Sequence, residues 1–107
     1  MAWMKAARLD ELAENEPLGV ELAGTSVALF LLNGAVHATG NICTHEFALL
    51  SDGYVEGGEI ECPLHQARFD IATGRALCAP ADKPIPVYAT KVENGEVLVE
   101  LPDTPGP

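Results

Sequence analysis

Two closely spaced pairs of cysteine and histidine constrain this chain more than any other feature of its sequence. One residue separates Cys43 from His45, and two residues separate Cys62 from His65. Thiolates and neutral imidazoles bind soft and borderline metal ions well, and each pair is short enough to hold one metal atom from a single loop. The sequence therefore predicts a metal centre with these four residues as ligands.

The third cysteine and the third histidine are predicted to lie outside this centre. His37 falls inside an expected strand with no other ligand residue at metal spacing, so we interpret it as an ordinary strand residue. Cys78 is left over once four ligands are assigned. We expect it to be a small buried residue near Pro80, because a cysteine without a reactive role behaves as a small apolar side chain.

Length and composition predict a single domain spanning residues 1–107. Hydrophobic residues make up 48% of the 107 residues, which suits a packed globule with a modest core. No apolar run approaches the roughly 18 residues of a membrane span. The first residues lack the apolar segment of a secretion signal, so we expect a cytoplasmic protein, where disulfides are disfavoured.

The chain is strongly acidic, with 16 acidic and 6 basic residues and a net charge of −10. Such a surface repels phosphate backbones and anionic lipids, so nucleic acids and membranes are poor partners. Two explanations stay open: the acidity steers basic protein partners, or it only keeps a small protein soluble. The carboxylates close to the ligands in sequence are Asp52, Glu56, Glu59 and Glu61.

Short apolar or alternating segments separated by turn residues predict an all-β fold. Asn33-Gly34 and Asn94-Gly95 are strong hairpin signals, and a further tight hairpin is expected within 51–58. No segment has a helical period. The expected strands are 2–7, 20–22, 26–32, 35–39, 59–61, 68–71, 87–92 and 97–101.

Three connecting segments have predictions of their own. Asp10 is placed to cap one isolated helical turn. Residues 17–19 contain proline and glycine and are predicted to form a turn, and the proline-rich segment 79–86 is predicted to be an ordered loop. Strands before and after the ligand segment are expected to form a base, on which that segment forms a small second layer.

Two cysteines and two histidines suit two kinds of metal centre. A structural zinc ion would be bound tetrahedrally by all four side chains. A 2Fe-2S cluster would instead place both cysteines on one iron and both histidines on the other. Zinc sites usually pair two cysteines at one end, whereas each pair here mixes cysteine and histidine, but the spacing alone leaves both alternatives open.

The ligand pattern resembles that of Rieske iron–sulfur proteins, and the chain looks most like the small Rieske ferredoxins of bacterial aromatic-ring dioxygenases. The resemblance implies one 2Fe-2S cluster, with Cys43 and Cys62 on the buried iron and His45 and His65 on the outer iron. It also implies antiparallel sheets forming a base sandwich, with a cluster-binding subdomain at about 41–80. The segments that carry the resemblance, all between Asn41 and Val92, are 43–45, 50–54, 62–65, 69–74 and Pro80.

The chain departs from the Rieske subunits of respiratory complexes at four positions. Ala48 and Leu64 stand where those subunits have a disulfide, so no disulfide joins the two loops. Ala67 and Phe69 stand where those subunits have hydroxyl donors. Donors stabilise the more negative reduced cluster, so their loss predicts a reduction potential near the negative end of the Rieske range.

The resemblance predicts an electron carrier and not an enzyme. The expected partners are a flavin-dependent NAD(P)H reductase, which supplies electrons, and a terminal Rieske non-haem iron oxygenase, which receives them, with the carrier acting as a monomer. Once His45 and His65 bind the cluster, no two-histidine and one-carboxylate set remains for a second iron. The alternatives are a Rieske-like small subunit of a reductase such as assimilatory nitrite reductase, and a structural zinc module.

Overall fold

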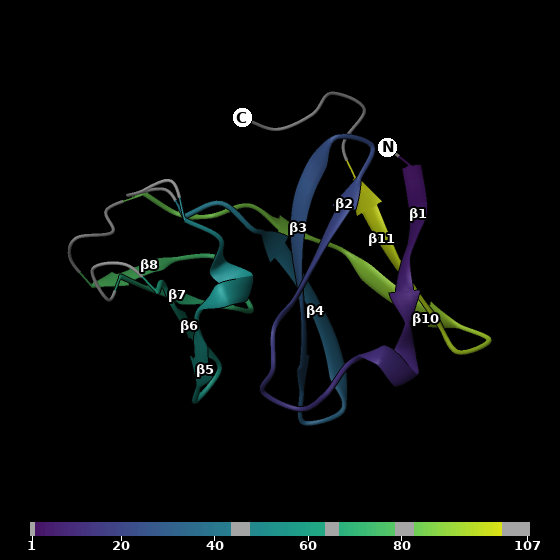
Figure 1. Cartoon of the computed structure of the whole chain (residues 1–107), viewed down its shortest axis with the longest axis horizontal. Helices are drawn as coiled ribbons and strands as arrows, with labels where there is room; N and C mark the ends of the chain where they lie inside the picture. Colours follow the sequence, from purple (N-terminus) through teal and green to yellow (C-terminus); the bar gives the residue numbers. More distant parts are fainter. Residues whose placement is uncertain (1, 44–47, 64–66, 79–82, 102–107) are drawn as a thin grey trace.

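The computed structural model describes residues 2–43, 48–63, 67–78 and 83–101, which form eleven β-strands and two 3₁₀ turns (Figure 1). This content confirms the all-β prediction. Among the described residues, no helix has the length and apolar character needed to cross a membrane. The elements are β1 (Ala2–Arg8), η1 (Leu9–Glu11), β2 (Leu18–Leu22), β3 (Thr25–Leu32), β4 (Ala35–Gly40), η2 (Leu50–Asp52), β5 (Tyr54–Glu56), β6 (Glu59–Glu61), β7 (Arg68–Asp70), β8 (Ala76–Cys78), β9 (Val87–Tyr88), β10 (Thr90–Glu93) and β11 (Glu96–Leu101).

The strands form three antiparallel sheets, as the resemblance implied. The first has the order β1-β11-β10, the second β2-β3-β4-β9, and the third β5-β6-β7-β8. In Figure 1 the first two sheets stand together, and the short strands of the third lie to one side of them. The third sheet contains the segment between and after the two predicted ligand loops.

Glycine-containing turns set the hairpin registers. Asn33 and Gly34 both have positive φ angles, 51° and 81°, and join β3 to β4. Asn94 and Gly95, at 53° and 76°, join β10 to β11 in the same way. Positive φ at both central residues matches the twist of antiparallel strands, and Asn-Gly adopts it at low cost. Both predicted Asn-Gly hairpins are therefore confirmed. The hairpin expected within 51–58 is also present, but it lies later in the chain, between β5 and β6 from Tyr54 to Glu61.

Strand β3 is buried on both faces and separates two apolar clusters. Val27 and Leu29 face the cluster between the first two sheets, while Ala28 and Phe30 belong to the cluster shared with the third sheet. This explains the continuous apolar run in the sequence, since a strand with one solvent-exposed face would alternate apolar and polar residues. Burying each large side chain such as Phe30 stabilises the fold by about 1.5–3 kcal/mol.

Three sequence predictions of local structure are wrong in detail, and one strand was not predicted. The expected strand 87–92 is split at Ala89, because β9 pairs with β4 while β10 pairs with β11. Leu18 and Gly19 belong to β2 and not to a turn, since they pair with Leu29 and Ala28 of β3.

The short turn near the N-terminus is η1, and Arg8, not Asp10, precedes it as the N-cap residue. Asp10 lies inside the turn, where its carboxylate accepts a hydrogen bond of 3.3 Å from Arg8 Nε. Strand β8 was not predicted, because its three residues, Ala76 to Cys78, are all apolar and do not alternate. Part of the predicted loop 79–86, residues 79–82, lies outside the described residues, while Ile85 is buried.

Candidate metal centre

The first predicted ligand loop begins where β4 leaves the base. A backbone hydrogen bond of 2.7 Å from Leu50 to Asn41 and a bridge between Ile42 and Leu49 bring the two ends of the loop together. The last contact of this short ladder is the amide of Cys43, which donates to the carbonyl of Ala48 at 2.9 Å. Cys43 therefore lies at the base of a closed loop.

The second predicted loop is closed in the same way. Cys62 follows β6, and its amide donates to the carbonyl of Ala67 at 2.7 Å, just before β7 begins. In both loops the first residue is a cysteine and the sixth is a buried alanine, and the cysteine N–H bonds the alanine C=O. The two predicted ligand loops are therefore closed by the same pair of residue types and the same backbone hydrogen bond.

Both thiols are buried in one apolar cluster. Cys43 is 3% exposed and Cys62 is 1% exposed, and neither forms a disulfide. Two soft sulfur donors at the bases of two loops, shielded from water, suit the inner iron of an iron–sulfur cluster. The other buried members of the cluster are Ala28, Phe30, Ala48, Leu50, Ile60, Ala67, Phe69, Ile71 and Ile85.

The two histidines of the predicted centre, His45 and His65, lie outside the described residues. Within the described part of the chain, no group of three or more histidine, cysteine, aspartate or glutamate residues could hold a metal ion. The complete four-residue ligand set therefore stays a prediction, while the two cysteines are placed in a common environment.

Ala67 and Phe69 are both fully buried in the cluster that contains the cysteines. Neither side chain carries a hydroxyl, so these positions supply no side-chain hydrogen bond to a sulfur. Ala48 is also buried, and all three cysteines of the chain are without disulfides, in agreement with the sequence. Leu64 lies outside the described residues.

His37 is an ordinary strand residue, as predicted, whereas the prediction for Cys78 is wrong. His37 is half-buried in β4 opposite Phe30 of β3. Cys78 is exposed, because it ends the edge strand β8 opposite Arg68, whose charged side chain points outward. Directly opposite residues on neighbouring strands share one face of the sheet. Cys78 therefore lies on the outer face with Arg68, and not on the face that packs against the core.

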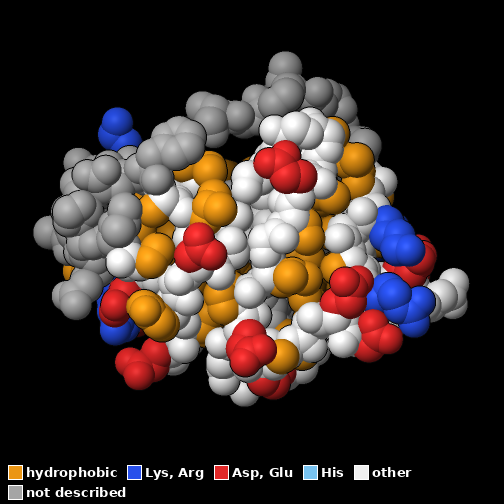
Figure 2. Space-filling view, viewed as in Figure 1, with side chains coloured by type: hydrophobic (Ala, Val, Ile, Leu, Met, Phe, Trp, Pro, Cys, Tyr) orange, Lys and Arg blue, Asp and Glu red, His pale blue; other side chains and the backbone are white. Residues whose placement is uncertain are grey.

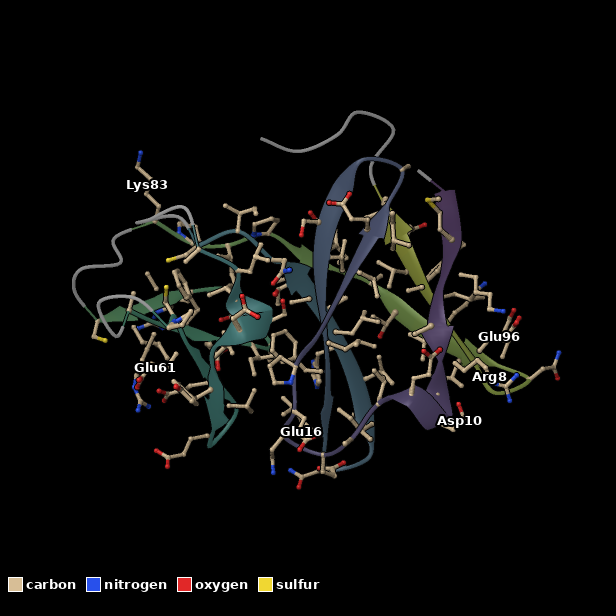
Figure 3. The ribbon with its side chains drawn as sticks, in the orientation of Figure 1. Arg8, Asp10, Glu16, Glu61, Lys83 and Glu96 are labelled. Atoms are coloured by element: carbon tan, nitrogen blue, oxygen red, sulfur yellow. The ribbon has the colours of Figure 1, made fainter. Side chains whose placement is uncertain are left out.

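Arg68 forms ion pairs with three of the four carboxylates that are close to the predicted ligands in sequence. Its guanidinium lies 2.9 Å from Glu61, 3.1 Å from Glu59 and 3.9 Å from Glu56. Hydrogen bonds to Glu59 and Glu61 hold the pKa of Arg68 above its usual value. Figure 3 shows Glu61 on the third sheet, away from the labelled ion pair of Arg8, in β1, with Asp10, in η1.

This arrangement of charges was not among the features predicted from the sequence. The signal was present as alternating Glu59 and Glu61 in one strand and Arg68 in the next, since alternate residues share one face of a sheet. On the face drawn in Figure 2, acidic side chains are spread over the surface and not gathered at one end. Near the second predicted ligand loop, the positive charge of Arg68 offsets part of the negative charge of its three carboxylate partners.

Comparison with known proteins places the chain in a family. The model of the Rieske [2Fe-2S] domain matches residues 2–89. The ferredoxin component of the naphthalene 1,2-dioxygenase system of Pseudomonas putida is 50% identical over 99 residues, which cover 92% of this chain and 95% of that protein.

Solved structures give the same result. The ferredoxin of Sphingomonas yanoikuyae B1 superposes with a TM-score of 0.90 at 36% identity, covering 94% of this chain and all of that one. The ferredoxin in a complex of reduced oxygenase and oxidized ferredoxin in carbazole 1,9a-dioxygenase superposes with a TM-score of 0.85 at 32% identity, covering 91% of each chain.

This chain belongs to the Rieske [2Fe-2S] family, and its cofactor is a Rieske-type 2Fe-2S cluster. Within that family it is a small ferredoxin, an electron-transfer protein and not a catalytic subunit. The two buried thiols, each at the base of a closed loop, fit this cofactor. Family membership decides between the two metal centres that spacing had left open, and excludes the structural zinc module.

Proposed function

We propose that this ferredoxin carries single electrons from a flavin-dependent NAD(P)H reductase to the terminal oxygenase of an aromatic-ring dioxygenase system. The observation that carries the proposal is the 50% identity, over nearly the full length of both chains, to the ferredoxin component of a naphthalene dioxygenase system. A structural relative in which the ferredoxin is bound to its oxygenase supports the terminal partner. The reductase is inferred because a ferredoxin needs an electron donor.

Four residues are proposed to hold the cluster: Cys43 and Cys62 at the inner iron, and His45 and His65 at the outer iron. When bound, the cluster supplies a one-electron redox couple whose potential depends on sulfur hydrogen bonds, charge and solvent access. The protein supplies the loops that hold the two thiolates and the apolar side chains that keep water from them. Phe30, Ile60 and Phe69 belong to that lining.

The chain is proposed to act as a single domain of residues 1–107. The first two sheets would serve as a rigid base, and the segment from about 41 to 80 would serve as the cluster-binding subdomain. The separate sheet formed by β5–β8 supports this division. We further propose a monomeric cytoplasmic protein, and size-exclusion chromatography at increasing protein concentration tests the monomer.

Reconstitution of electron transfer tests the proposal. Purified holoprotein is combined with NADH and the reductase and terminal oxygenase of a naphthalene dioxygenase system, and dihydroxylated product is measured. We expect product formation to require this ferredoxin and to be lost in Cys43→Ala, whereas Cys78→Ala, the matched thiol change at an exposed position, should keep it. If wild-type protein with an intact cluster is not reduced by the reductase, the proposed place in the electron-transfer chain is wrong.

A tight complex with a large catalytic chain would favour the alternative, a small subunit of a reductase such as nitrite reductase. That alternative predicts co-purification with such a chain when this protein is isolated from its natural host. The carrier proposal predicts isolation of the small chain alone, with its cluster intact.

A further inference from the structure

Asn41 is a buried polar residue just before the first ligand loop. It is 2% exposed, and its backbone ties two distant segments together. Its N–H donates to the carbonyl of Ser26 in β3 at 3.1 Å, and its C=O accepts from Leu50 in η2 at 2.7 Å. Asn41 therefore joins the base sheet to both ends of the loop that starts at Cys43.

The side chain of Asn41 extends the same connection. Its Nδ2 donates to Ser26 Oγ at 3.2 Å and to Ser51 Oγ at 3.1 Å, and its Oδ1 accepts from the Ser51 backbone N–H at 2.7 Å. Asn41 is buried, the two serines are partly buried, and both polar atoms of the Asn41 side chain are satisfied. Hydrogen bonds in such surroundings of lowered dielectric are stronger than in water and specific in geometry. One amide thus fixes β3 against η2.

Strand β2 covers this network so closely that only glycine fits. A methyl group at Gly19 would lie 2.6 Å from Ser51 Oγ and 3.0 Å from Asn41 Nδ2. Both distances are short for a carbon against a polar atom, so a side chain at Gly19 must displace the Ser51 hydroxyl or the Asn41 amide. The backbone of the base sheet therefore packs directly on the network.

The second ligand loop is held in a different way. Its flanking residues, Glu61 and Arg68, are cross-strand neighbours joined by a surface ion pair at 2.9 Å. Both residues belong to the third sheet, so this pair links that sheet to itself and not to the base. Among the described residues, Asn41 is the one whose side chain hydrogen-bonds both a base strand and the turn that ends a ligand loop.

We propose that Asn41 is a positioning residue that fixes Cys43 relative to the base sheets. The proposal rests on the assignment of Cys43 as a cluster ligand. Cys43 follows Asn41 by two residues, and the Cys43–Ala48 hydrogen bond continues the ladder that Asn41 begins. Cys43 is only 3% exposed while the network is intact. Without the side-chain amide of Asn41, the ends of the loop separate from β3 and water reaches the Cys43 thiol.

This role predicts effects on the cluster itself. Water near a ligand sulfur stabilises the more negative reduced state, so loss of the network should raise the midpoint potential. Residues that orient metal ligands typically change metal affinity 10–100-fold when replaced. We therefore expect Asn41→Leu to bind the cluster about 10–100 times less tightly than wild type, and to lose iron to a ferrous chelator faster.

The test compares Asn41→Leu with Thr39→Val in the holoprotein. Thr39 is equally buried two residues earlier in the chain, and its side chain makes one hydrogen bond, to the carbonyl of Gly40 at 2.9 Å. Both changes replace a buried polar side chain with an apolar one of similar shape. We expect both to lower thermal stability, but only Asn41→Leu to shift the midpoint potential, the electron paramagnetic resonance g values and the rate of iron release.

Gly19→Ala provides a second variant, which keeps every network residue and disturbs the network sterically. It should shift the same three quantities in the same direction by a smaller amount, and it keeps the test decisive if Asn41→Leu fails to fold. Wild-type potential and g values in the folded Asn41→Leu or Gly19→Ala protein, or equal shifts in Thr39→Val, would overturn the proposal. Retention of the cluster in Cys43→Ala would instead overturn the ligand assignment on which it rests.

Discussion

Gly53 lies directly against the carbonyl oxygen of Glu61, with no room for a side chain between them. Gly53 ends η2, the turn that follows the first ligand loop, and Glu61 immediately precedes Cys62 in the second. This close backbone approach brings the end of one loop onto the start of the other. We therefore expect this glycine, which binds no metal, to help set the spacing of the two cysteines.

Gly53→Ala should destabilise the protein, because the added methyl group overlaps Glu61 and approaches the carbonyl of Leu50 at 3.1 Å. Overpacking of this kind typically costs about 1–3 kcal/mol in the free energy of unfolding. Gly24→Ala is the control: Gly24 has a φ of 82° but no neighbouring atom within 4 Å, so only backbone strain of about 1–2 kcal/mol is expected.

Chemical denaturation measures both costs, and electron paramagnetic resonance separates them. Only Gly53→Ala should change the spectrum of the reduced cluster, because only this substitution moves one loop relative to the other. Identical spectra for the two variants would show that the approach of Gly53 to Glu61 does not set the geometry of the centre.

The reduction potential is predicted to lie in the lower third of the Rieske range, which runs from about −150 to +300 mV. Ala67 and Phe69 are fully buried beside the cysteines and donate no side-chain hydrogen bond, so the reduced cluster lacks that stabilisation. Ala67→Ser or Phe69→Tyr should raise the potential if the new hydroxyl reaches a sulfur.

Ala38→Ser is the matched control for Ala67→Ser. Ala38 is also fully buried but belongs to the cluster between the first two sheets, which contains no cysteine. A redox titration should show an unchanged potential for this variant. A wild-type midpoint above about +100 mV would contradict the link between missing hydroxyls and low potential.

Arg68→Gln should lower the potential and weaken the third sheet. The change removes a positive charge next to the second loop and leaves Glu56, Glu59 and Glu61 without their common partner. Negative charge near the cluster disfavours the added electron. Both effects should shrink as salt rises, since exposed charges are screened over about 8–10 Å at physiological ionic strength.

Arg8→Gln serves as the comparison, because Arg8 makes a similar exposed ion pair, with Asp10 at 3.3 Å, at the end of the first sheet. It should leave the potential unchanged at every salt concentration. A shift of equal size in Arg8→Gln and Arg68→Gln would mean that net charge alone, and not the position of Arg68, sets the electrostatic contribution.

Much of the fold could be predicted because its signals are local. The Asn33-Gly34 turn defines a hairpin from two residues, and the apolar run in β3 indicates a strand buried on both faces. The two pairs of ligand residues also carry their own signal, since metal binding constrains residues within each loop. Cys43 and Cys62 accordingly lie in one buried cluster.

The remaining features depend on contacts that sequence spacing does not reveal. The change of sheet at Ala89 depends on which strands lie beside β9 and β10, and the exposure of Cys78 depends on its register with Arg68. The Asn41 network joins residues 10 and 15 positions away. A single asparagine before a ligand loop gives no indication of such partners.

The most direct test of the account is the electron paramagnetic resonance spectrum of the dithionite-reduced protein and of six single variants. The wild type should give the rhombic signal of a Rieske cluster, and the signal should disappear in Cys43→Ala, His45→Ala, Cys62→Ala and His65→Ala. His37→Ala and Cys78→Ala, which change the remaining histidine and cysteine, should keep it. Loss of the signal in His37→Ala together with its survival in His45→Ala would contradict the assignment of the metal centre.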